Sequence, residues 1–444
     1  MTRTLVAYLC TSCGHRAPKW LGRCPGCGEW NTLQEEAAPR AARNGHARPA
    51  AVARLADVDT AEGARMPTGI AELDRVLGGG LVPGSLVLIG GEPGVGKSSL
   101  LLQALAAASA RGLRTLLVSG EESPAQVRMR AERLAAAGGV SILAETDLEV
   151  VVETVAAELP DVCVIDSVQT LHAADIGSGA GSVAQVREAA DRLLRLAKAR
   201  GVAIVLVGHV TKDGTVAGPR VLEHLVDAVL QLEGDRYRHL RVLRAVKNRF
   251  GSTDEIGIFE MTGAGLVPVA DPSSALAEDG AAGPGAVLLP AIEGTRPILL
   301  EVQALVAASD LAMPRRQATG FDRNRLSMIL AVLGRHAGVS LGSSDVFVNV
   351  AGGVRVDEPA ADLAVALAIV SSHRGRPPGE RLACFGEIGL TGRLRPVGHT
   401  GPRLAEAARL GVTEVVAPAG TSAPASLTMR CADTLDAAIG LALA

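Results

Sequence analysis

The segment GEPGVGKSS, residues 91–99, limits what this chain can fold into more than any other part of it. It follows an apolar run, Leu86–Ile89, and leads into a stretch of helical character, Ser98–Ala110. A glycine-rich loop of the form G-x4-G-K-[ST] between a strand and a helix wraps backbone N–H groups around phosphates. The sequence therefore predicts an α/β P-loop fold. The alternative is a glycine-rich turn that binds no ligand and has a strand before it and a helix after it only by chance. The expected nucleotide-binding residues are Gly91, Glu92, Pro93, Gly94, Val95, Gly96, Lys97, Ser98 and Ser99.

Two side chains of this loop have expected roles toward ATP and its metal. Lys97 should reach the β- and γ-phosphates, and the Ser98 hydroxyl should ligate Mg²⁺. A second apolar run, Val162–Ile165, ends in Asp166. An aspartate at a buried strand end fits the acid that holds Mg²⁺ through water in P-loop ATPases. Asp166 could otherwise be a solvated strand end.

Acidic and polar residues follow two further apolar runs. Thr115–Val118 ends in SGEE, where a carboxylate could activate the attacking water. We prefer Glu121 over Glu122 for this role, and the alternative is that both acids are solvated. Val202–Val207 ends in Gly208 and His209, and a polar residue there could sense the γ-phosphate and pass its state to the next loop. His209 could instead be a histidine with no such role.

The pattern of apolar residues also predicts the architecture around the loop. Continuous Val/Leu/Ile runs without polar alternation are typical of a parallel sheet covered on both faces. Residues 181–200 show the helical period instead, which predicts an amphipathic crossover helix ending before Gly201. We therefore expect an ATPase domain over residues 57–270.

A compact module is predicted at the front of the chain, over residues 1–35. It contains two CxxC pairs separated by ten residues: Cys10, Cys13, Cys24 and Cys27. Two such knuckles can bring four thiolates into a tetrahedron around one structural Zn²⁺, without which so small a unit could not fold. The alternative is redox or disulfide chemistry. His15 lies beside the ligands, but four thiolates already complete the shell.

Composition sets broader limits. With 444 residues, 48% hydrophobic and 20% charged, the chain should be globular with two or three domains. A formal charge of −3 means that a nucleic-acid partner must meet a local basic surface. No signal-like or membrane-spanning stretch is visible, and we expect a cytoplasmic protein. Cys163, Cys384 and Cys431 are expected to be inert core thiols.

A basic linker is predicted at 36–56 and a second linker at 271–285.

Several segments together resemble the bacterial RadA (Sms) family of DNA-repair proteins over essentially the whole chain. These segments are Lys19-Trp20 and Trp30-Asn31 in the four-cysteine front, residues 91–99, residues 208–230, and KNRFG at 247–251. The resemblance implies a RecA-like core that works as a homo-oligomer, a hexameric ring. Such a ring binds single-stranded and branched DNA, moves on the single strand, and extends recombination intermediates by branch migration beside the RecA recombinase.

The resemblance also suggests which residues meet DNA or a neighbouring subunit. Lys247 and Arg249 could be delivered to the phosphates bound by the next subunit of a ring. They could equally contact DNA or form a basic surface turn, and the sequence does not separate these roles. Candidate DNA loops facing the channel are the glycine-rich, flexible 171–182 and the segment 211–219 with Lys212. Both loops lack aromatic residues, so we expect electrostatic backbone contacts.

Residues 286–444 resemble the proteolytic domain of Lon, in the segments GVRVDEPAAD at 353–362 and GEIGLTGRLRPVG at 386–398. Lon-type proteolysis needs a serine activated by a lysine. The resemblance places these positions on Ala360 and near Gly401, so we expect a catalytically dead protease that serves as a scaffold. Four arginines could present positive charge to DNA or could form a solvated or salt-bridged face: Arg315, Arg316, Arg323 and Arg325.

The sequence thus favours a DNA-dependent, helicase-like ATPase that uses ATP, Mg²⁺ and Zn²⁺ in homologous-recombination repair. A nucleotide-gated DNA- or partner-binding module, or a circadian-clock-like kinase, without translocation is the alternative. An ATP-dependent protease is argued against by the missing serine–lysine pair. The polarity of movement, the subunit count, the RecA-binding surface and the contacts of the zinc module stay open.

Overall fold

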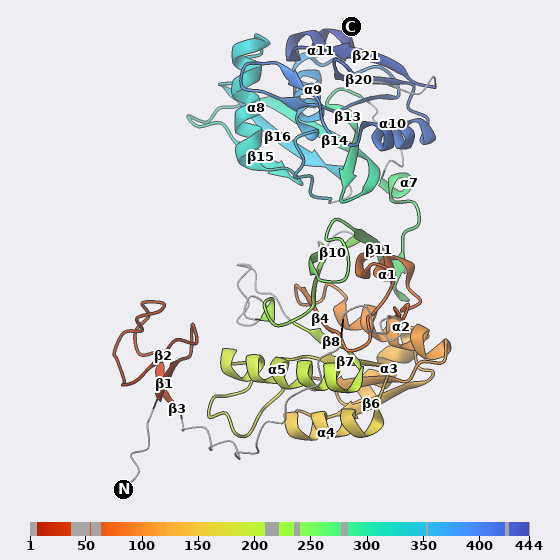
Figure 1. Cartoon of the computed structure of the whole chain (residues 1–444). Helices are drawn as coiled ribbons and strands as arrows, with labels where there is room; N and C mark the ends of the chain where they lie inside the picture. Colours follow the sequence, from red (N-terminus) through yellow and green to blue (C-terminus); the bar gives the residue numbers. More distant parts are fainter. Residues whose placement is uncertain are drawn as a thin grey trace. The chain divides into compact units, whose positions relative to one another are not determined.

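The structure is a computed structural model that describes residues 7–36, 54, 64–208, 222–234, 240–276, 283–351, 354–421 and 426–443. It forms two compact units (Figure 1). The first comprises Met1–Thr253 with Phe259–Pro268, and the second comprises Asp254–Ile258 with Val269–Ala444.

A nine-stranded sheet forms the centre of the first unit, in the order β12-β11-β10-β9-β4-β8-β7-β5-β6. Its strands are β4 (Leu86–Gly91), β5 (Thr115–Ser119), β6 (Val140–Ala144), β7 (Val162–Asp166), β8 (Ala203–Val207), β9 (Ala228–Glu233), β10 (Leu240–Asn248), β11 (Ile256–Thr262) and β12 (Gly265–Pro268). The six strands from β9 to β6 are parallel, as the continuous apolar runs predicted. The antiparallel pairs β9–β10 and β11–β12 extend the sheet beyond what those runs indicated.

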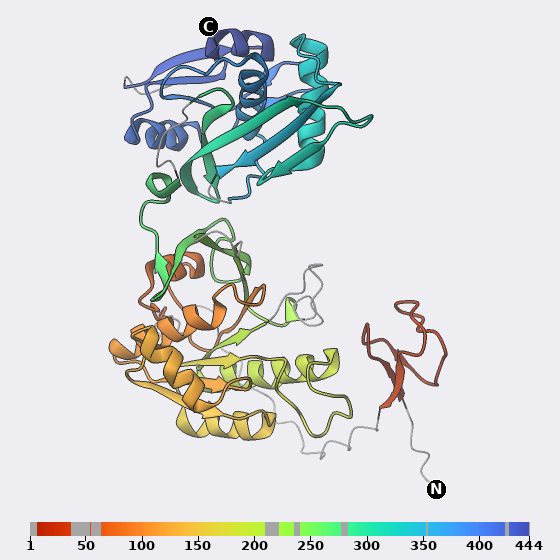
Figure 2. The same ribbon diagram turned by 180° about the vertical axis from the view of Figure 1, so that it is seen from behind.

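Helices cover both faces of the parallel strands (Figures 1 and 2). They are α1 (Ala71–Leu77), α2 (Lys97–Ala110), α3 (Pro124–Arg133), α4 (Leu148–Glu158) and α5 (Val183–Arg200). Because strand side chains alternate, Val87 and Ile89 pack under α1, α2 and α3, whereas Leu86 and Leu88 pack under α4 and α5. The predicted crossover helix is α5, which ends at Gly201 in the left-handed conformation.

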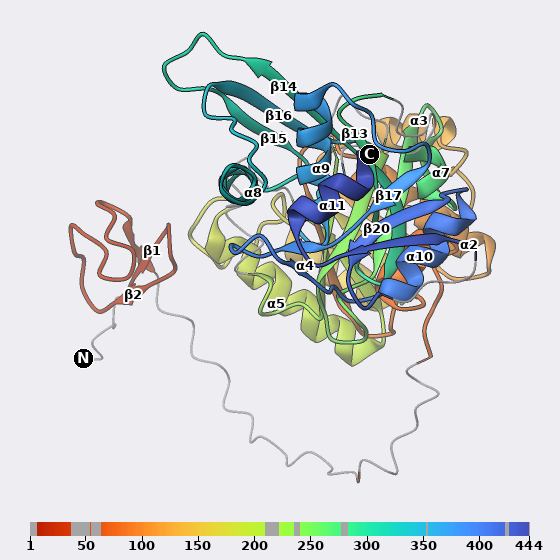
Figure 3. The same cartoon turned by 90° about the horizontal axis from the view of Figure 1, so that it is seen from above.

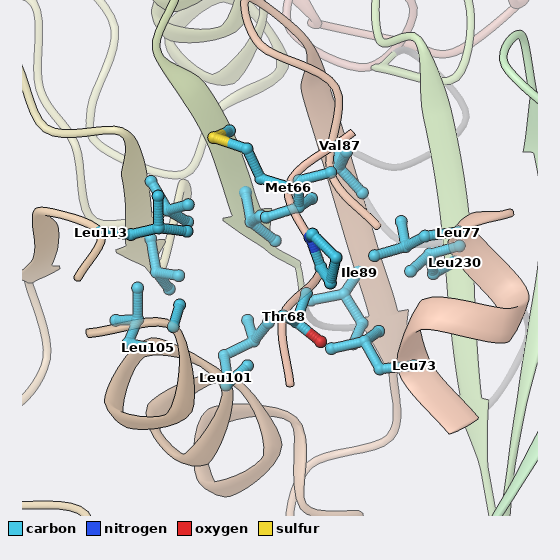
Figure 4. A pocket seen from close by; sticks show the side chains of 17 residues that line it. Met66, Thr68, Leu73, Leu77, Val87, Ile89, Leu101, Leu105, Leu113 and Leu230 are labelled. Atoms are coloured by element: carbon cyan, nitrogen blue, oxygen red, sulfur yellow. The ribbon is translucent and has the colours of Figure 1, made fainter. Parts of the chain in front are cut away.

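One small cavity lies inside this core, lined by residues of α1, α2 and β4 among others (Figure 4). Its volume is about 20 Å³, and its labelled lining is apolar except for Thr68. A space of that size holds no more than about one water molecule, and an apolar lining gives water few partners. It is therefore a packing gap and not the nucleotide site.

The zinc module, red in Figure 1, contains a three-stranded antiparallel sheet in the order β2-β1-β3. The strands are β1 (Ala7–Cys10), β2 (Arg16–Ala17) and β3 (Leu33–Glu36). Its buried residues are few: Cys10, Ala17, Cys24 and Leu33. So small a core cannot offset the conformational entropy of folding without a further cross-link.

The second unit contains a seven-stranded mixed sheet, β15-β16-β14-β13-β17-β20-β21, and a small pair, β18–β19. Its elements are α7 (Pro272–Leu276), β13 (Ala286–Glu293), β14 (Arg296–Ala308), β15 (Arg316–Thr319), α8 (Arg323–His336), β16 (Ser344–Val350), α9 (Ala361–Arg374), β17 (Leu382–Cys384), β18 (Glu387–Ile388), β19 (Leu394–Arg395), α10 (Thr400–Arg409), β20 (Glu414–Pro418), β21 (Thr428–Ala432) and α11 (Leu435–Ala442). Helix α9 is buried from Ala361 to Ser371 and contacts β13, β14, α8 and α11 (Figure 3). Its many alanines let the neighbouring elements approach closely.

In the described part of the chain, no helix combines the length and the apolar character that crossing a membrane requires.

Candidate nucleotide site and zinc module

The loop 91–99 joins the end of β4 to the start of α2, as predicted. Two of its glycines are required by close approach. Gly91 has φ 156°, and a Cβ atom there would lie 2.5 Å from the Leu232 carbonyl oxygen. Gly96 has φ 114°, and a Cβ atom would lie 2.6 Å from side-chain atoms of Leu266 and Met261. At Gly91 the backbone oxygen leaves no room for a side chain, and at Gly96 the positive φ strains any residue other than glycine.

Lys97 is the first residue of α2 and is 4% exposed. Its Nζ donates hydrogen bonds to the carbonyl oxygens of Gly91 (2.8 Å) and Glu92 (3.0 Å). Burial lowers the pKa of Lys97, and the negative charges of Asp166 and Glu121 act in the opposite direction. The ammonium group therefore lies inside the loop and within electrostatic reach of both acids.

The two acids that sequence reasoning chose are held next to each other. Strands β5 and β7 are neighbours, with Ser119 opposite Asp166 at their C-terminal ends. Ser167, which is fully buried, donates its Oγ hydrogen to Glu121 Oε1 at 2.6 Å. Sequence reasoning missed Ser167; its place directly after Asp166 was the only available signal.

Glu121 and Glu122 have different surroundings. Glu122 is paired with Arg130 of α3 at 2.9 Å, and Arg130 also lies 3.8 Å from Asp166. Glu121 is exposed and fixed by Ser167, so its carboxylate is both positioned and accessible to water. This arrangement agrees with the preference for Glu121, and it gives Glu122 a structural partner instead.

The donors also fit the expected metal. Mg²⁺ binds hard oxygen ligands and keeps several waters. The hydroxyl of Ser98, one residue into α2, and the carboxylate of Asp166, at the end of β7, are groups of this kind at the same end of the parallel strands. Together with Lys97 and Glu121 they could hold a metal-bound triphosphate and orient a water toward it.

Lys247 and Arg249 lie at the other end of the same sheet. Residue 248 is opposite Ala228, where β9 begins, and Asp227 Oδ2 accepts a hydrogen bond from the Leu86 amide at the start of β4. Arg249 pairs with Asp227 at 3.1 Å. Lys247 Nζ donates to the Glu223 and Val226 carbonyl oxygens, at 2.6 and 2.8 Å. The length of β4, about 16 Å at ~3.3 Å per residue, separates this turn from the loop 91–99 of its own chain.

The cysteine cluster has the geometry of a zinc site. The four Sγ atoms lie within 4.8 Å of one another, and the Cys10–Cys27 and Cys13–Cys24 pairs are 3.6 Å apart. A tetrahedron with Zn–S bonds of about 2.3 Å has sulfur atoms about 3.8 Å apart, so the residues present fit Zn²⁺. The two knuckles repeat the same turn, because the Gly28 amide donates to the Cys24 carbonyl oxygen as the Gly14 amide does to that of Cys10.

Comparisons with known proteins agree with this order of parts. Family models match residues 8–35 (rubredoxin metal binding domain), residues 48–215 (AAA domain) and residues 336–425 (Lon protease C-terminal proteolytic domain). The chain is 50% identical to DNA repair protein RadA of Brucella abortus, over 95% of this chain and 93% of that one. It is 47% identical to that of Bacillus subtilis, over 94% and 93%, and 49% identical to that of Escherichia coli, over 93% and 92%. The chain belongs to the RadA family.

Family membership confirms the fold class predicted from the sequence: a four-cysteine zinc ribbon, a P-loop ATPase core and a Lon-like domain. It also gives this RadA-family chain an ATPase domain and a zinc-binding module. Two predicted site residues, His209 and Lys212, lie outside the residues that the structure describes.

For two of the four arginines the structure favours the salt-bridged alternative, and two other predictions need correction. Arg325 is paired with the buried Asp362, and Arg316 donates to the Arg315, Ser344 and Leu341 carbonyl oxygens, so neither guanidinium is free for DNA. Arg315 and Arg323 are exposed.

The segment 171–182 is not a free loop. Gln185 of α5 is fully buried, and its side chain makes four hydrogen bonds to the backbone of this segment, with Ala173 N, Ala173 O, Ile176 O and Ser178 O.

Cys431 is exposed on the edge strand β21, whereas Cys163 and Cys384 are buried as expected.

The Lon-like domain lacks the residues that Lon-type proteolysis requires. Ala360 is buried directly before α9, and Gly401 lies in α10. The sequence contains no lysine after Lys247, so no serine–lysine pair can form within this domain of the chain.

Proposed function

We propose that this chain is a DNA-dependent ATPase that translocates on single-stranded DNA and promotes branch migration of recombination intermediates. It would act in the cytoplasm as a homo-oligomeric ring, beside the RecA recombinase, in DNA repair. Family membership supports the repair role, and the geometry of two separated groups in the ATPase core supports the ring.

The observation that carries the proposal is the distance within one chain between the loop 91–99 and the pair Lys247 and Arg249. The loop lies at the C-terminal ends of the parallel strands and the pair at their N-terminal ends. A cation that far away cannot reach the γ-phosphate of its own subunit. In a head-to-tail ring, however, opposite ends of neighbouring cores can meet, so these cations would serve the next subunit's nucleotide.

The residues around the loop then have distinct tasks. Lys97 and the loop amides would bind the phosphates, and Ser98 and Asp166 would hold Mg²⁺, which neutralises the charge that develops on the phosphoryl group. Glu121 would orient the attacking water and accept its proton, with Ser167 fixing the carboxylate. After hydrolysis, release of the cleaved phosphate would remove the negative charge that draws Lys247 and Arg249 across the interface. The interface would thereby open, and the change would be passed to DNA.

The Lon-like domain would act as a scaffold. Its lack of lysine removes the base that a Lon-type serine nucleophile needs. Its exposed basic residues Arg315 and Arg323 could add weak, salt-dependent contacts to the DNA backbone.

A direct test compares the wild type with Lys97→Ala and Arg249→Ala. ATP hydrolysis is measured with and without single-stranded DNA, and strand extension is measured on a branched DNA substrate. Lys97→Ala should lose nucleotide turnover, and Arg249→Ala should lose DNA-coupled work. Hydrolysis that single-stranded DNA does not stimulate, or full strand extension by Arg249→Ala, would contradict the proposal.

A further inference from the structure

The zinc module carries two large exposed aromatic side chains that neither the metal nor the module's core uses. Trp20 is 54% exposed and Trp30 is 69% exposed. Burial of a tryptophan is normally among the larger apolar gains available to a fold. Two exposed indoles on a module of this size therefore indicate a surface that binds something.

The two indoles share one face of the module. A Cβ atom placed on Gly22 would lie 3.7 Å from Trp30 Cζ3 and 3.8 Å from Trp20 Cη2, so both rings lie within van der Waals reach of one point. Arg23 forms a backbone bridge with Trp30. The Arg23 side chain is fixed by a 2.7 Å hydrogen bond to the Gly28 carbonyl, and its guanidinium lies 5.9 Å from the Trp30 ring centroid.

Basic residues outnumber acidic ones in this part of the sequence, although the exposed Glu29 directly precedes Trp30. Residues 1–28 contain four basic residues and no acidic residue, and the exposed Lys19 is next to Trp20. The sequence that follows, 37–56, adds four arginines and again no acid. Over residues 1–56 there are eight Lys and Arg against three Asp and Glu, in a chain whose net charge is −3. The local field at this end of the sequence therefore favours a polyanion.

We propose that Trp20 and Trp30 form a stacking surface for the bases of single-stranded DNA, with Lys19 and Arg23 beside the phosphates. Non-specific single-strand binding combines positive groups that follow the backbone with aromatic rings that stack on bases. The candidate channel segments 171–182 and 211–219 contain no Phe, Tyr or Trp, so the zinc module supplies the component that they lack. The inference rests on the proposed function only in taking single-stranded DNA as the ligand.

A protein partner is the competing occupant of such a surface. Tryptophan and arginine are also enriched in protein interfaces, but the centres of those interfaces are depleted of charge. Here Arg23 lies over the Trp30 ring, the exposed Lys19 is next to Trp20 in sequence, and a basic segment of sequence follows. The charge pattern therefore favours nucleic acid.

Intrinsic tryptophan fluorescence tests the proposal on the full-length, zinc-loaded wild type. The chain has only two tryptophans, and both lie in this module, so the signal reports on no other site. Adding oligothymidylate should quench the emission with the same Kd as that given by the anisotropy of a labelled oligonucleotide. An abasic oligonucleotide of equal length should bind more weakly and leave the emission unchanged, because it has no bases to stack.

Substitutions supply a second measurement. Trp30→Ala should weaken oligothymidylate binding about tenfold, which corresponds to about 1.4 kcal/mol, while Trp30→Phe should stay near the wild type. Met129→Ala, which removes an exposed hydrophobic side chain from α3, is the matched control and should bind normally. Zinc content, measured with a chromogenic chelator, should be equal in all of them, and ATP hydrolysis without DNA should not change.

The outcomes separate this inference from the proposed function. Suppose that single-stranded DNA binds and stimulates hydrolysis without changing the tryptophan emission, and that Trp30→Ala binds it as tightly as the wild type. That result would refute the stacking surface and would favour a protein partner for the two rings. If the wild type binds no single-stranded DNA at all, the proposed function fails first and this inference with it.

Discussion

Arg325 holds the carboxylate of Asp362 with two hydrogen bonds, from Nε to Oδ1 and from Nη2 to Oδ2 at 2.6 Å. Asp362 is fully buried in the first turn of α9 and also accepts a hydrogen bond from the Ile388 amide at 3.0 Å. Burial raises the pKa of Asp362, and the bonds from Arg325 and Ile388 oppose that rise. The pair therefore keeps a charged carboxylate inside the Lon-like domain.

We expect Arg325→Gln to destabilise the protein by about 3 kcal/mol, because it leaves a buried charge without its partner. Without Arg325 the pKa of Asp362 should rise further above its unfolded value. A carboxyl group whose folded pKa is raised binds protons more readily in the folded state, so stability falls as pH rises. The loss should therefore be larger at pH 8 than at pH 5, as measured by urea unfolding.

The control is Arg323→Gln, two residues earlier and exposed, which should change stability by less than about 0.5 kcal/mol. An equal loss in both variants, or a loss for Arg325→Gln that does not depend on pH, would show that the ion pair is not the cause.

Most of the correct predictions came from patterns within short contiguous segments of the sequence. The loop 91–99, the CxxC pairs and the apolar runs each lie within a few residues, so their local geometry follows from their own sequence. The parallel sheet followed from unbroken apolar runs such as Val162–Ile165, because a strand with one solvated face would have alternated.

The relationships that the sequence did not reveal join residues far apart along the chain. Ser167 reaches Glu121 only because β5 and β7 are neighbours in register, and no local pattern encodes that pairing. Gln185 lies in the predicted amphipathic helix, and nothing in the local sequence distinguishes it, yet it is buried and anchors the segment before it. Arg325 likewise appeared as one of several surface charges, since its buried partner lies 37 residues away.

The different surroundings of the two adjacent acids predict different effects on hydrolysis. Glu121→Gln should lower kcat by about 10²–10⁴-fold with little change in KM for ATP, because an amide cannot accept the proton of the attacking water. Glu122→Gln should keep most of the activity, since Glu122 serves Arg130. Steady-state ATP hydrolysis of the two variants measures both, and a larger kcat loss in Glu122→Gln would reverse the assignment.

Zinc should be a structural requirement of the N-terminal module. Cys24→Ser should release the metal, because Cys24 is a buried member of the four-cysteine cluster in a core of only four residues. Cys431→Ser changes an exposed cysteine outside the module and is the matched control, which should retain one zinc per chain. Metal analysis after purification decides this. If Cys24→Ser retains zinc at the wild-type level, then zinc does not bind at the four-cysteine site.

Mixing two inactive variants tests whether Lys247 and Arg249 act on a neighbouring subunit. Lys97→Ala lacks the phosphate-binding lysine but keeps Arg249, and Arg249→Ala has the reverse deficiency. If the arginine serves the next subunit, a mixed ring contains interfaces with one intact residue from each side. In a random 1:1 ring this holds for about a quarter of the interfaces, so the part of ATP hydrolysis that single-stranded DNA stimulates should recover to about a quarter of the wild-type value.

A role within one chain predicts the opposite result, because each subunit would still lack one residue and the mixture would only average two inactive proteins. The strand length that separates Arg249 from its own P-loop favours recovery. Mixing Lys97→Ala with Glu121→Gln is the control, since both residues belong to the same chain's site and no interface is restored. Subunits must exchange for either mixture to be informative, and fluorescence transfer between differently labelled subunits measures that exchange directly. Exchange without recovery in the first mixture would remove the argument for a ring that shares its active sites.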